Sequence, residues 1–161
     1  MSERLLAREQ FFPYPVEKVF EPFSRAENLQ ALTPPWLHFR ITTKLPIEMR
    51  EGALIEYRRR FHGVPVRWRT EIEVWEPPHR FVDLALKSPF ALWHHTHTFE
   101  AVEGGTLACD RVRYRVGFGP LGEAAHAMVV GRDLERIFDF RREAIERFIA
   151  PISEPRPPAE R

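Results

Sequence analysis

The chain has 161 residues, 43% of them hydrophobic and 29% charged, and a formal net charge of +1 at pH 7. This composition excludes a disordered chain and is typical of one globular domain, long enough to bury a sizeable core. The near-zero net charge provides no global field that would attract nucleic acid or a membrane surface. The single cysteine, Cys109, excludes an internal disulfide and favours a reducing compartment.

The N-terminal residues MSERLLAREQ carry charges where a secretory signal needs an apolar run. No apolar stretch reaches the length of about 18 residues that a membrane span needs. We therefore expect a cytoplasmic protein, a monomer or a homodimer, with no membrane span and no nucleic-acid partner.

The first part of the chain predicts one strand and two short helices. The strand covers residues 4–12 and ends at Pro13. Pro15 suits the start of a helix, where its missing N–H costs little. Apolar residues then follow at helical spacing: Val16, Val19, Phe20 and Phe23. A second short helix is expected over 26–32, and Thr33-Pro34-Pro35 ends it because a residue before proline avoids the helical conformation.

Alternation of apolar and charged residues predicts a β-hairpin over 54–74, with one apolar and one solvated face. Gly63-Val64 is the expected two-residue loop, of type II′, because glycine accepts a positive φ at its first position. This register sets Arg59, an inward charged residue, opposite Trp68. On the outer face it pairs like charges: Arg58 with Arg69, and Arg60 with Arg67.

Three further strands and one long helix complete the pattern: strands 80–87, 91–101 and 106–116, and a helix over about 123–150. Pro151 is expected to end the helix, and the proline-rich residues 151–161 are expected to be disordered. A sheet with one apolar face must be covered, and only the final helix is long enough to do so. The sequence therefore predicts a single α+β domain over 1–150, in which a curved antiparallel sheet wraps the C-terminal helix.

Six segments carry a resemblance to a known superfamily: LTPPWLHFRI (32–41), the run from Gly63 to Trp68, WEPPHRFVD (75–83), SPFALWHHTHTFE (88–100), GGTLACDRVRY (104–114) and RDLERIFDFRREAI (132–145). Over residues 3–150 the chain resembles the SRPBCC or START-like group, which includes the birch-pollen-allergen helix-grip fold and the polyketide cyclase/dehydrase-type proteins. Members of the branch it resembles often have glycine where this chain has Ser88, a difference that concerns only a turn. The resemblance implies a deep cavity for lipids, sterols, polyketides or hormones, and in some members cyclisation or dehydration.

The register of the second hairpin places two histidines and one aspartate on the inner face. With Glu103-Gly104 as a two-residue loop, three facing pairs follow: His97 with Asp110, His95 with Val112, and Trp93 with Tyr114. The alternate positions of the return strand carry three arginines and Cys109, which we expect to face water. Because a buried carboxylate needs a partner, a charge-assisted contact between Asp110 and His97 is expected. The pattern leaves the facing of strand 80–87, and so of Asp83, open.

We interpret the inner face as a pocket for a small hydrophobic or aromatic ligand, such as a lipid or a polyketide, in a carrier or sensor. The candidate ligand-binding residues combine apolar walls with polar anchors: Tyr57, Arg59, Trp68, Asp83, Trp93, His95, His97, Phe99, Asp110, Tyr114, Phe138 and Arg141. Arg59 could neutralise an acid or hold a ligand carboxylate. The alternative is a filled core whose polar groups satisfy one another.

Catalysis is the second interpretation. A histidine paired with an aspartate can act as a general acid or base near neutral pH, so the candidate catalytic residues of a cyclase or dehydratase are His97, Asp110 and His95. The two histidines and Asp110 also supply a two-histidine, one-carboxylate metal donor set. No further histidine lies at a useful spacing, and we expect neither a metal nor any other cofactor, redox cofactors included.

Two other patterns have structural explanations. The run from Gly117 to Gly122 has the spacing G-x-G-x-x-G, but a dinucleotide site needs an acidic residue after a second strand, and Asp139 lies within the final helix. The facing arginines of the first hairpin could attract an anionic partner, but Glu71 and Glu73 dilute their charge, and a solvated face is expected.

Overall fold

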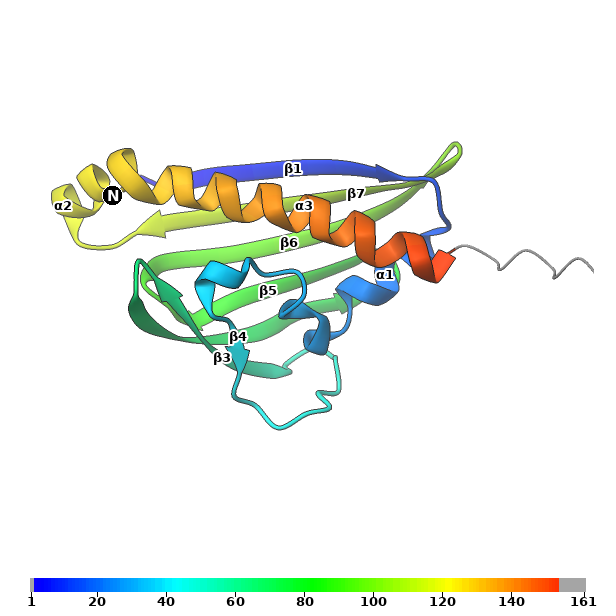
Figure 1. Cartoon of the computed structure of the whole chain (residues 1–161), viewed down its shortest axis with the longest axis horizontal. Coiled ribbons are helices and arrows are strands. Elements are labelled where there is room, and N and C mark those ends of the chain that lie inside the picture. The colour runs from blue at the N-terminus through cyan, green and yellow to red at the C-terminus, as the bar shows by residue number, and fades with distance from the viewer. Residues whose placement is uncertain (1, 154–161) are drawn as a thin grey trace, which may run out of the picture.

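The computed structural model describes residues 2–153, which form a seven-stranded antiparallel sheet crossed by one long helix (Figure 1). The strands are β1 (Arg4–Phe12), β2 (Arg40–Ile41), β3 (Leu54–Phe61), β4 (Val64–Glu76), β5 (Arg80–Lys87), β6 (Phe90–Val102) and β7 (Gly105–Val116). Their order in the sheet is β1-β7-β6-β5-β4-β3-β2, so β1 is placed at one edge beside β7. Every other strand neighbours the next in the sequence, as short hairpin connections require.

The helices fall into two groups along the chain. Between β1 and β2 lie α1 (Val16–Phe23) and two 3₁₀ turns, η1 (Ala26–Leu29) and η2 (Pro35–Leu37). After β7, α2 (Gly119–Ala125) continues through the π-helical turn η3 (His126–Val130) into α3 (Gly131–Ser153). Figure 1 shows α3 lying along the sheet, with α2 at one end and α1 near the other. This is the α+β helix-grip arrangement that the sequence predicts.

Apolar side chains fill the space between sheet and helix at both ends of α3. At the α1 end, Phe20 and Phe23 pack edge-on against Phe99, with ring centroids 5.3 and 5.0 Å away. Ile145 and Ile149 of α3 belong to the same cluster and are 1% exposed. At the other end, a second set packs together: Leu6, Trp68, Trp93, Val112, Tyr114, Leu134 and Phe138. None of the helices within residues 2–153 is both long and apolar enough to cross a membrane.

The loop of the β3–β4 hairpin lies one residue earlier than predicted. His62 and Gly63 occupy the loop with φ values of 48° and 81°, and two positive φ angles define a type I′ turn rather than type II′. Val64 is β-branched and pairs as the first residue of β4 instead. Arg59 therefore lies opposite Val66, and the prediction that it faces Trp68 is wrong.

The same shift changes the arginine pairs on the outer face. Arg58 lies opposite Arg67 rather than Arg69, and Arg60 lies opposite Pro65 rather than Arg67. Arg69 instead forms an ion pair with Glu56, the residue directly opposite it. Two facing arginine pairs were expected, and the structure has one, Arg58 with Arg67. The outer face therefore carries less concentrated positive charge than predicted, and an anion-binding role for it is less favoured.

The long C-terminal helix begins earlier and ends later than predicted. Helical structure starts at Gly119 because Pro120 occupies the first turn of α2, where a missing N–H costs little. At the other end α3 continues to Ser153, since proline has a helical φ and Pro151 removes only one hydrogen bond from the last turn. Residues 154–161 lie outside the described part of the chain, and the disorder expected over 151–161 stays a prediction. The second short helix is also shorter than the expected 26–32, because it is the 3₁₀ turn η1.

Candidate ligand-binding pocket

A cavity of about 110 Å³ lies between the inner face of the sheet and α3. Strands β3 to β6 contribute one wall, α3 contributes another through Leu134, Ile137 and Phe138, and the segment from α1 to η1 closes the end near Phe23. An apolar cavity of roughly 150 Å³ holds benzene, so this volume is on the scale of a single aromatic ring or a short chain.

Eight of the twelve candidate ligand-binding residues line this cavity: Tyr57, Arg59, Asp83, Trp93, His95, His97, Phe138 and Arg141. The other four do not, because neighbouring side chains cover them. Trp68 is 2% exposed and packs edge-on against Trp93, and Phe99 is held in the cluster beside α1. Tyr114 shares a hydrogen bond of 2.8 Å with His126 of η3. Asp110 borders a second, smaller cavity behind the histidines, beside Arg141.

The β6–β7 register predicted from the Glu103-Gly104 loop is confirmed. His97 lies opposite Asp110, and His95 lies opposite Val112. On the other side of β6, Asp83 of β5 lies opposite His95, and its side chain lines the cavity. The question that the sequence left open is thereby answered, because Asp83 faces inward. The strands on both sides of β6 each bring one carboxylate to its two histidines.

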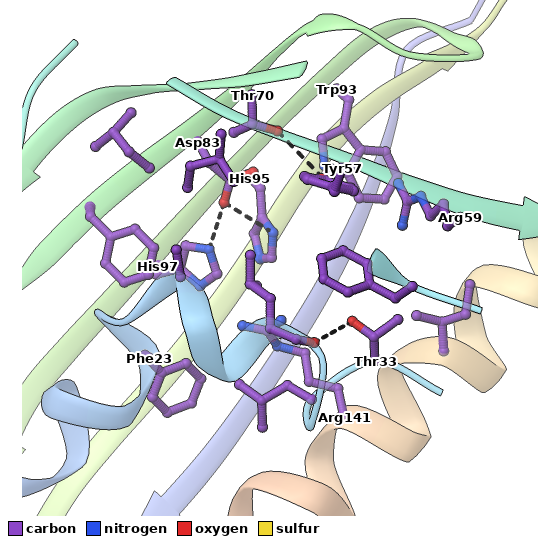
Figure 2. A pocket seen from close by; sticks show the side chains of 18 of the residues that line it. Phe23, Thr33, Tyr57, Arg59, Thr70, Asp83, Trp93, His95, His97 and Arg141 are labelled. Atoms are coloured by element: carbon purple, nitrogen blue, oxygen red, sulfur yellow. Dashed lines mark hydrogen bonds and ion pairs between the residues drawn. The ribbon is translucent and has the colours of Figure 1, made fainter. Parts of the chain in front are cut away.

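Each histidine directs one ring nitrogen toward each aspartate. His95 Nε2 is hydrogen-bonded to Asp110 Oδ1 at 2.9 Å, and its Nδ1 lies 3.6 Å from Asp83 Oδ2. His97 Nε2 is hydrogen-bonded to Asp83 Oδ2 at 2.8 Å, and Figure 2 shows Asp83 joined to both rings. The predicted contact between His97 and Asp110 is present at ion-pair distance, with Nδ1 2.7 Å from Oδ1, although the N–H does not point along a hydrogen bond.

The four groups divide into charged and neutral forms according to their neighbours. Burial by itself raises the pKa of Asp83 and Asp110, but the two histidines and Arg141 outweigh it, so that the pKa of Asp83 is lowered and that of Asp110 lies well below its ordinary value. Burial and the charge of His97 lower the pKa of His95. Burial also acts to lower the pKa of His97, but the two aspartates raise it overall. Both aspartates are therefore ionised more readily than usual, and His97 holds a proton more readily than His95 does.

Stacking holds the two imidazole rings in place. The ring of His97 lies between Phe81, whose centroid is 4.1 Å away at 18°, and His95, whose centroid is 3.8 Å away at 34°. His95 in turn contacts Phe138 of α3, with centroids 5.7 Å apart. The arrangement can hold a proton on one ring and accept one on the other, directly beside the cavity.

Asp83, His95 and His97 can also be considered as metal donors. One atom from each lies within 4.8 Å of the other two, and two histidines with one carboxylate are a recurring donor set. The carboxylate of this set is Asp83, whereas the sequence pointed to Asp110, which lies behind His95. In the structure His97 is hydrogen-bonded to Asp83 within the set, and His95 Nε2 is hydrogen-bonded to Asp110 outside it. The expectation of no metal and no cofactor stays a prediction.

Arg59 lies apart from this group on β3. Its guanidinium carbon is 3.6 Å from the ring centroid of Trp68, and Phe61 and Tyr57 follow at 5.0 and 5.6 Å. Its Nε is buried and has no hydrogen-bond partner within residues 2–153. Burial lowers the pKa of Arg59, and the charges of Tyr57 and Asp83 offset this only in part.

The sequence matches the family model described as polyketide cyclase/dehydrase and lipid transport over residues 12–141. The chain belongs to this family. The match spans the cavity walls from α1 to Arg141, and it agrees with the resemblance to the SRPBCC helix-grip superfamily. A search of curated proteins finds no match.

Solved structures share the fold of this polyketide cyclase/dehydrase family member at low sequence identity. The Zhui aromatase/cyclase from Streptomyces sp. R1128 superposes with a TM-score of 0.74 and 12% identity, covering 92% of this chain and 94% of that one. TTHA0849 from Thermus thermophilus gives 0.69 and 21%, covering 94% and 100%. The protein Ara h 8.0201 gives 0.66 and 15%, covering 93% and 99%. At these identities the likeness confirms the helix-grip fold alone.

Several wall residues escaped the sequence reasoning for this family member. Thr70 lies on the inner face of β4 and could have been found from the same alternation that identified Tyr57. Phe39 and Met49 also line the cavity, but they come from irregular segments on either side of β2. Such segments have no period, so only the folded chain shows which way their side chains point.

Proposed function

We propose that this protein binds a small, largely apolar or aromatic molecule in the cavity, as a carrier or sensor. The observation that carries the proposal is the composition of the cavity wall. Aromatic and aliphatic side chains form most of it, and a few polar groups, among them His95, His97 and Arg59, converge on the same space. Small-molecule sites usually have this composition.

The alternative of a filled core is disfavoured by the packing around the cavity. The aromatic clusters on either side are closely packed, with ring centroids about 5 to 6 Å apart, yet volume remains between them. The family description, which includes lipid transport, supports the binding of a hydrophobic molecule.

Filling the cavity tests the proposal. Ala26 is 2% exposed and lines the cavity, so Ala26→Leu occupies space that a ligand would need. We expect native mass spectrometry and thermal shifts with a panel of aromatic acids, amides and fatty acids to show binding to the unaltered protein and none to Ala26→Leu. Overpacking of this kind costs about 1–3 kcal/mol, so folding is checked by circular dichroism.

The matched control is Ala101→Leu, at an exposed position near the end of β6. This variant should bind as the unaltered protein does. If Ala26→Leu bound the panel equally well, the cavity would not be the binding site. If no panel member bound and nothing co-purified, a filled core would be the better description.

Acid–base catalysis on the bound molecule is the second candidate, and one observation favours it. His95 and His97 are adjacent at the cavity wall, and their surroundings move their pKa values in opposite directions. Pairs of groups whose pKa values are pushed apart are typical of acid and base roles in cyclisation or dehydration. The test is to incubate an identified ligand with the protein and to analyse the ligand by mass spectrometry. Loss of the mass of one water from the ligand would support catalysis, and an unchanged ligand would support the carrier or sensor role.

A further inference from the structure

Of the charged groups at the cavity, Arg59 is the one without an ion-pair contact within residues 2–153. Asp83 and Asp110 both contact His97, and the Nε of Arg141 lies 4.0 Å from Asp110 Oδ2. The guanidinium of Arg59 forms no ion pair and no hydrogen bond with any of residues 2–153. Arg59 therefore has no acid in direct contact, and a cation whose Nε is buried without a hydrogen bond is costly.

Stacking occupies the face of the Arg59 guanidinium and leaves its edge free. The cation lies over the ring of Trp68, with Phe61 on one side. A cation–π contact uses the flat face of the group, whereas its N–H donors lie in the plane and point outward. Neither ring offers an acceptor in that plane. The free edge presents the fork of N–H groups that matches the two oxygens of a carboxylate.

The position of Arg59 within the cavity fits one end of an amphipathic molecule. Figure 2 shows Arg59 beside Tyr57 and Trp93, on the other side of the pocket from His97. Between these polar ends lie apolar walls that include Trp93, Ile137 and Phe138. A cavity of about 110 Å³ leaves space for little more than one ring or a short chain between them.

We infer that the ligand is a small aromatic or apolar carboxylic acid whose carboxylate pairs with Arg59. The inference rests on the proposed function and specifies the chemical class of the ligand. The carboxylate supplies the acceptor that the guanidinium edge lacks, and the apolar part lies along Trp93 and Phe138. Arg141 is not the anchor, because its Nε lies at ion-pair distance from Asp110, whereas no carboxylate of residues 2–153 lies at that distance from Arg59.

Benzoate and benzamide test the inference, because they have nearly the same shape and differ in charge. Isothermal titration calorimetry at pH 7.5 should show benzoate binding at least tenfold more tightly than benzamide to the unaltered protein. Arg59→Gln should weaken benzoate at least tenfold and leave benzamide within twofold, so that the preference disappears. Arg59→Lys keeps the charge without the fork and should retain an intermediate preference.

The matched control is Arg60→Gln, the next residue on β3, which is exposed. It should keep the full preference for benzoate. Equal binding of the two compounds to the unaltered protein, or a preference that survives in Arg59→Gln, would overturn the inference. A preference that is lost in Arg141→Gln but kept in Arg59→Gln would also overturn it. Binding of neither compound to any variant would contradict the proposed function, and the inference with it.

Discussion

At the residue scale, two buried histidines of the same strand have pKa values that are shifted in opposite directions. His95 and His97 lie two positions apart on β6, and each has Asp83 and Asp110 within ion-pair distance. Two imidazolium rings with centroids 3.8 Å apart repel each other, so a proton added to His97 lowers the pKa of His95. The aspartates stabilise that proton on His97.

Asp110→Asn should show what the carboxylate contributes to stability. The folded pKa of Asp110 lies well below its ordinary value of about 4, so its contribution is present above about pH 4 and is lost as pH falls through the folded pKa. Removing one partner of a buried pair costs about 3 kcal/mol. We expect urea unfolding to give a loss of that size at pH 7, and a much smaller loss near pH 2.

The control is Asp139→Asn on the outer side of α3, where the carboxylate is 67% exposed and pairs with Arg8. An exposed pair of this kind contributes less than about 1 kcal/mol at any pH. A loss for Asp110→Asn that stays constant between pH 7 and pH 2 would contradict the charge assignment and leave only a packing effect.

At the element scale, the glycines that resemble a nucleotide-binding run are explained by the start of α2. A Cβ at Gly122 would lie 1.7 Å from the carbonyl oxygen of Gly117, at the close approach of α2 to the end of β7. Gly119 has a φ of 56°. Gly122 is required by close packing, and Gly119 is required by its positive φ. Neither requirement involves a ligand.

Gly122→Ala should therefore destabilise the protein, because backbone must move to admit the methyl group. We expect the free energy of unfolding in urea to fall by about 1–3 kcal/mol, the usual cost of overpacking. Gly117→Ala is the control, since nothing lies within 4 Å of a Cβ there. Equal losses for the two variants would show that the contact with Gly117 is not what requires glycine at position 122.

The two hairpins show how far loop chemistry predicts register. In the structure, glycine is the second residue of both two-residue loops, His62-Gly63 and Glu103-Gly104. For the β6–β7 hairpin, the prediction placed glycine second in the loop, and the register was right. For the β3–β4 hairpin, it placed glycine first, and the loop was wrong by one residue. Moving the β3–β4 loop by one residue shifts the pairing across the hairpin by two residues. Because side chains alternate with a period of two, the predicted and the observed registers keep the same face of the hairpin inward.

At the scale of the whole molecule, the space under α3 is filled beside α1, and it holds a cavity beside Leu134, Ile137 and Phe138. Ile145 is 1% exposed within the cluster beside α1, whereas Ile137 is partly exposed and lines the cavity. Ile145→Ala should lower the free energy of unfolding by about 2–5 kcal/mol in urea, and Ile137→Ala by roughly half of that or less, because no new cavity forms.

Ligand size gives a second readout of the same pair of variants. Ile137→Ala enlarges the cavity and should improve the binding of 2-naphthoate relative to benzoate, while Ile145→Ala should leave their ratio unchanged in calorimetry. The opposite pattern would place the binding space beside α1.

The expectations of a cytoplasmic location, of a monomer or homodimer and of no nucleic-acid partner stay predictions.

The sequence by itself determined the class of fold, the inner face of most strands and the pairing of His97 with Asp110. These follow from periods of two and 3.6 residues and from loop length, which are local properties of the chain. The tertiary structure decided that Asp83 faces the histidines, that Asp110 lies behind them, and that Arg59 packs against aromatic rings without an acid from residues 2–153 in contact. These depend on which side chains of separate strands and of α3 meet in the same volume, and no period along the chain records that.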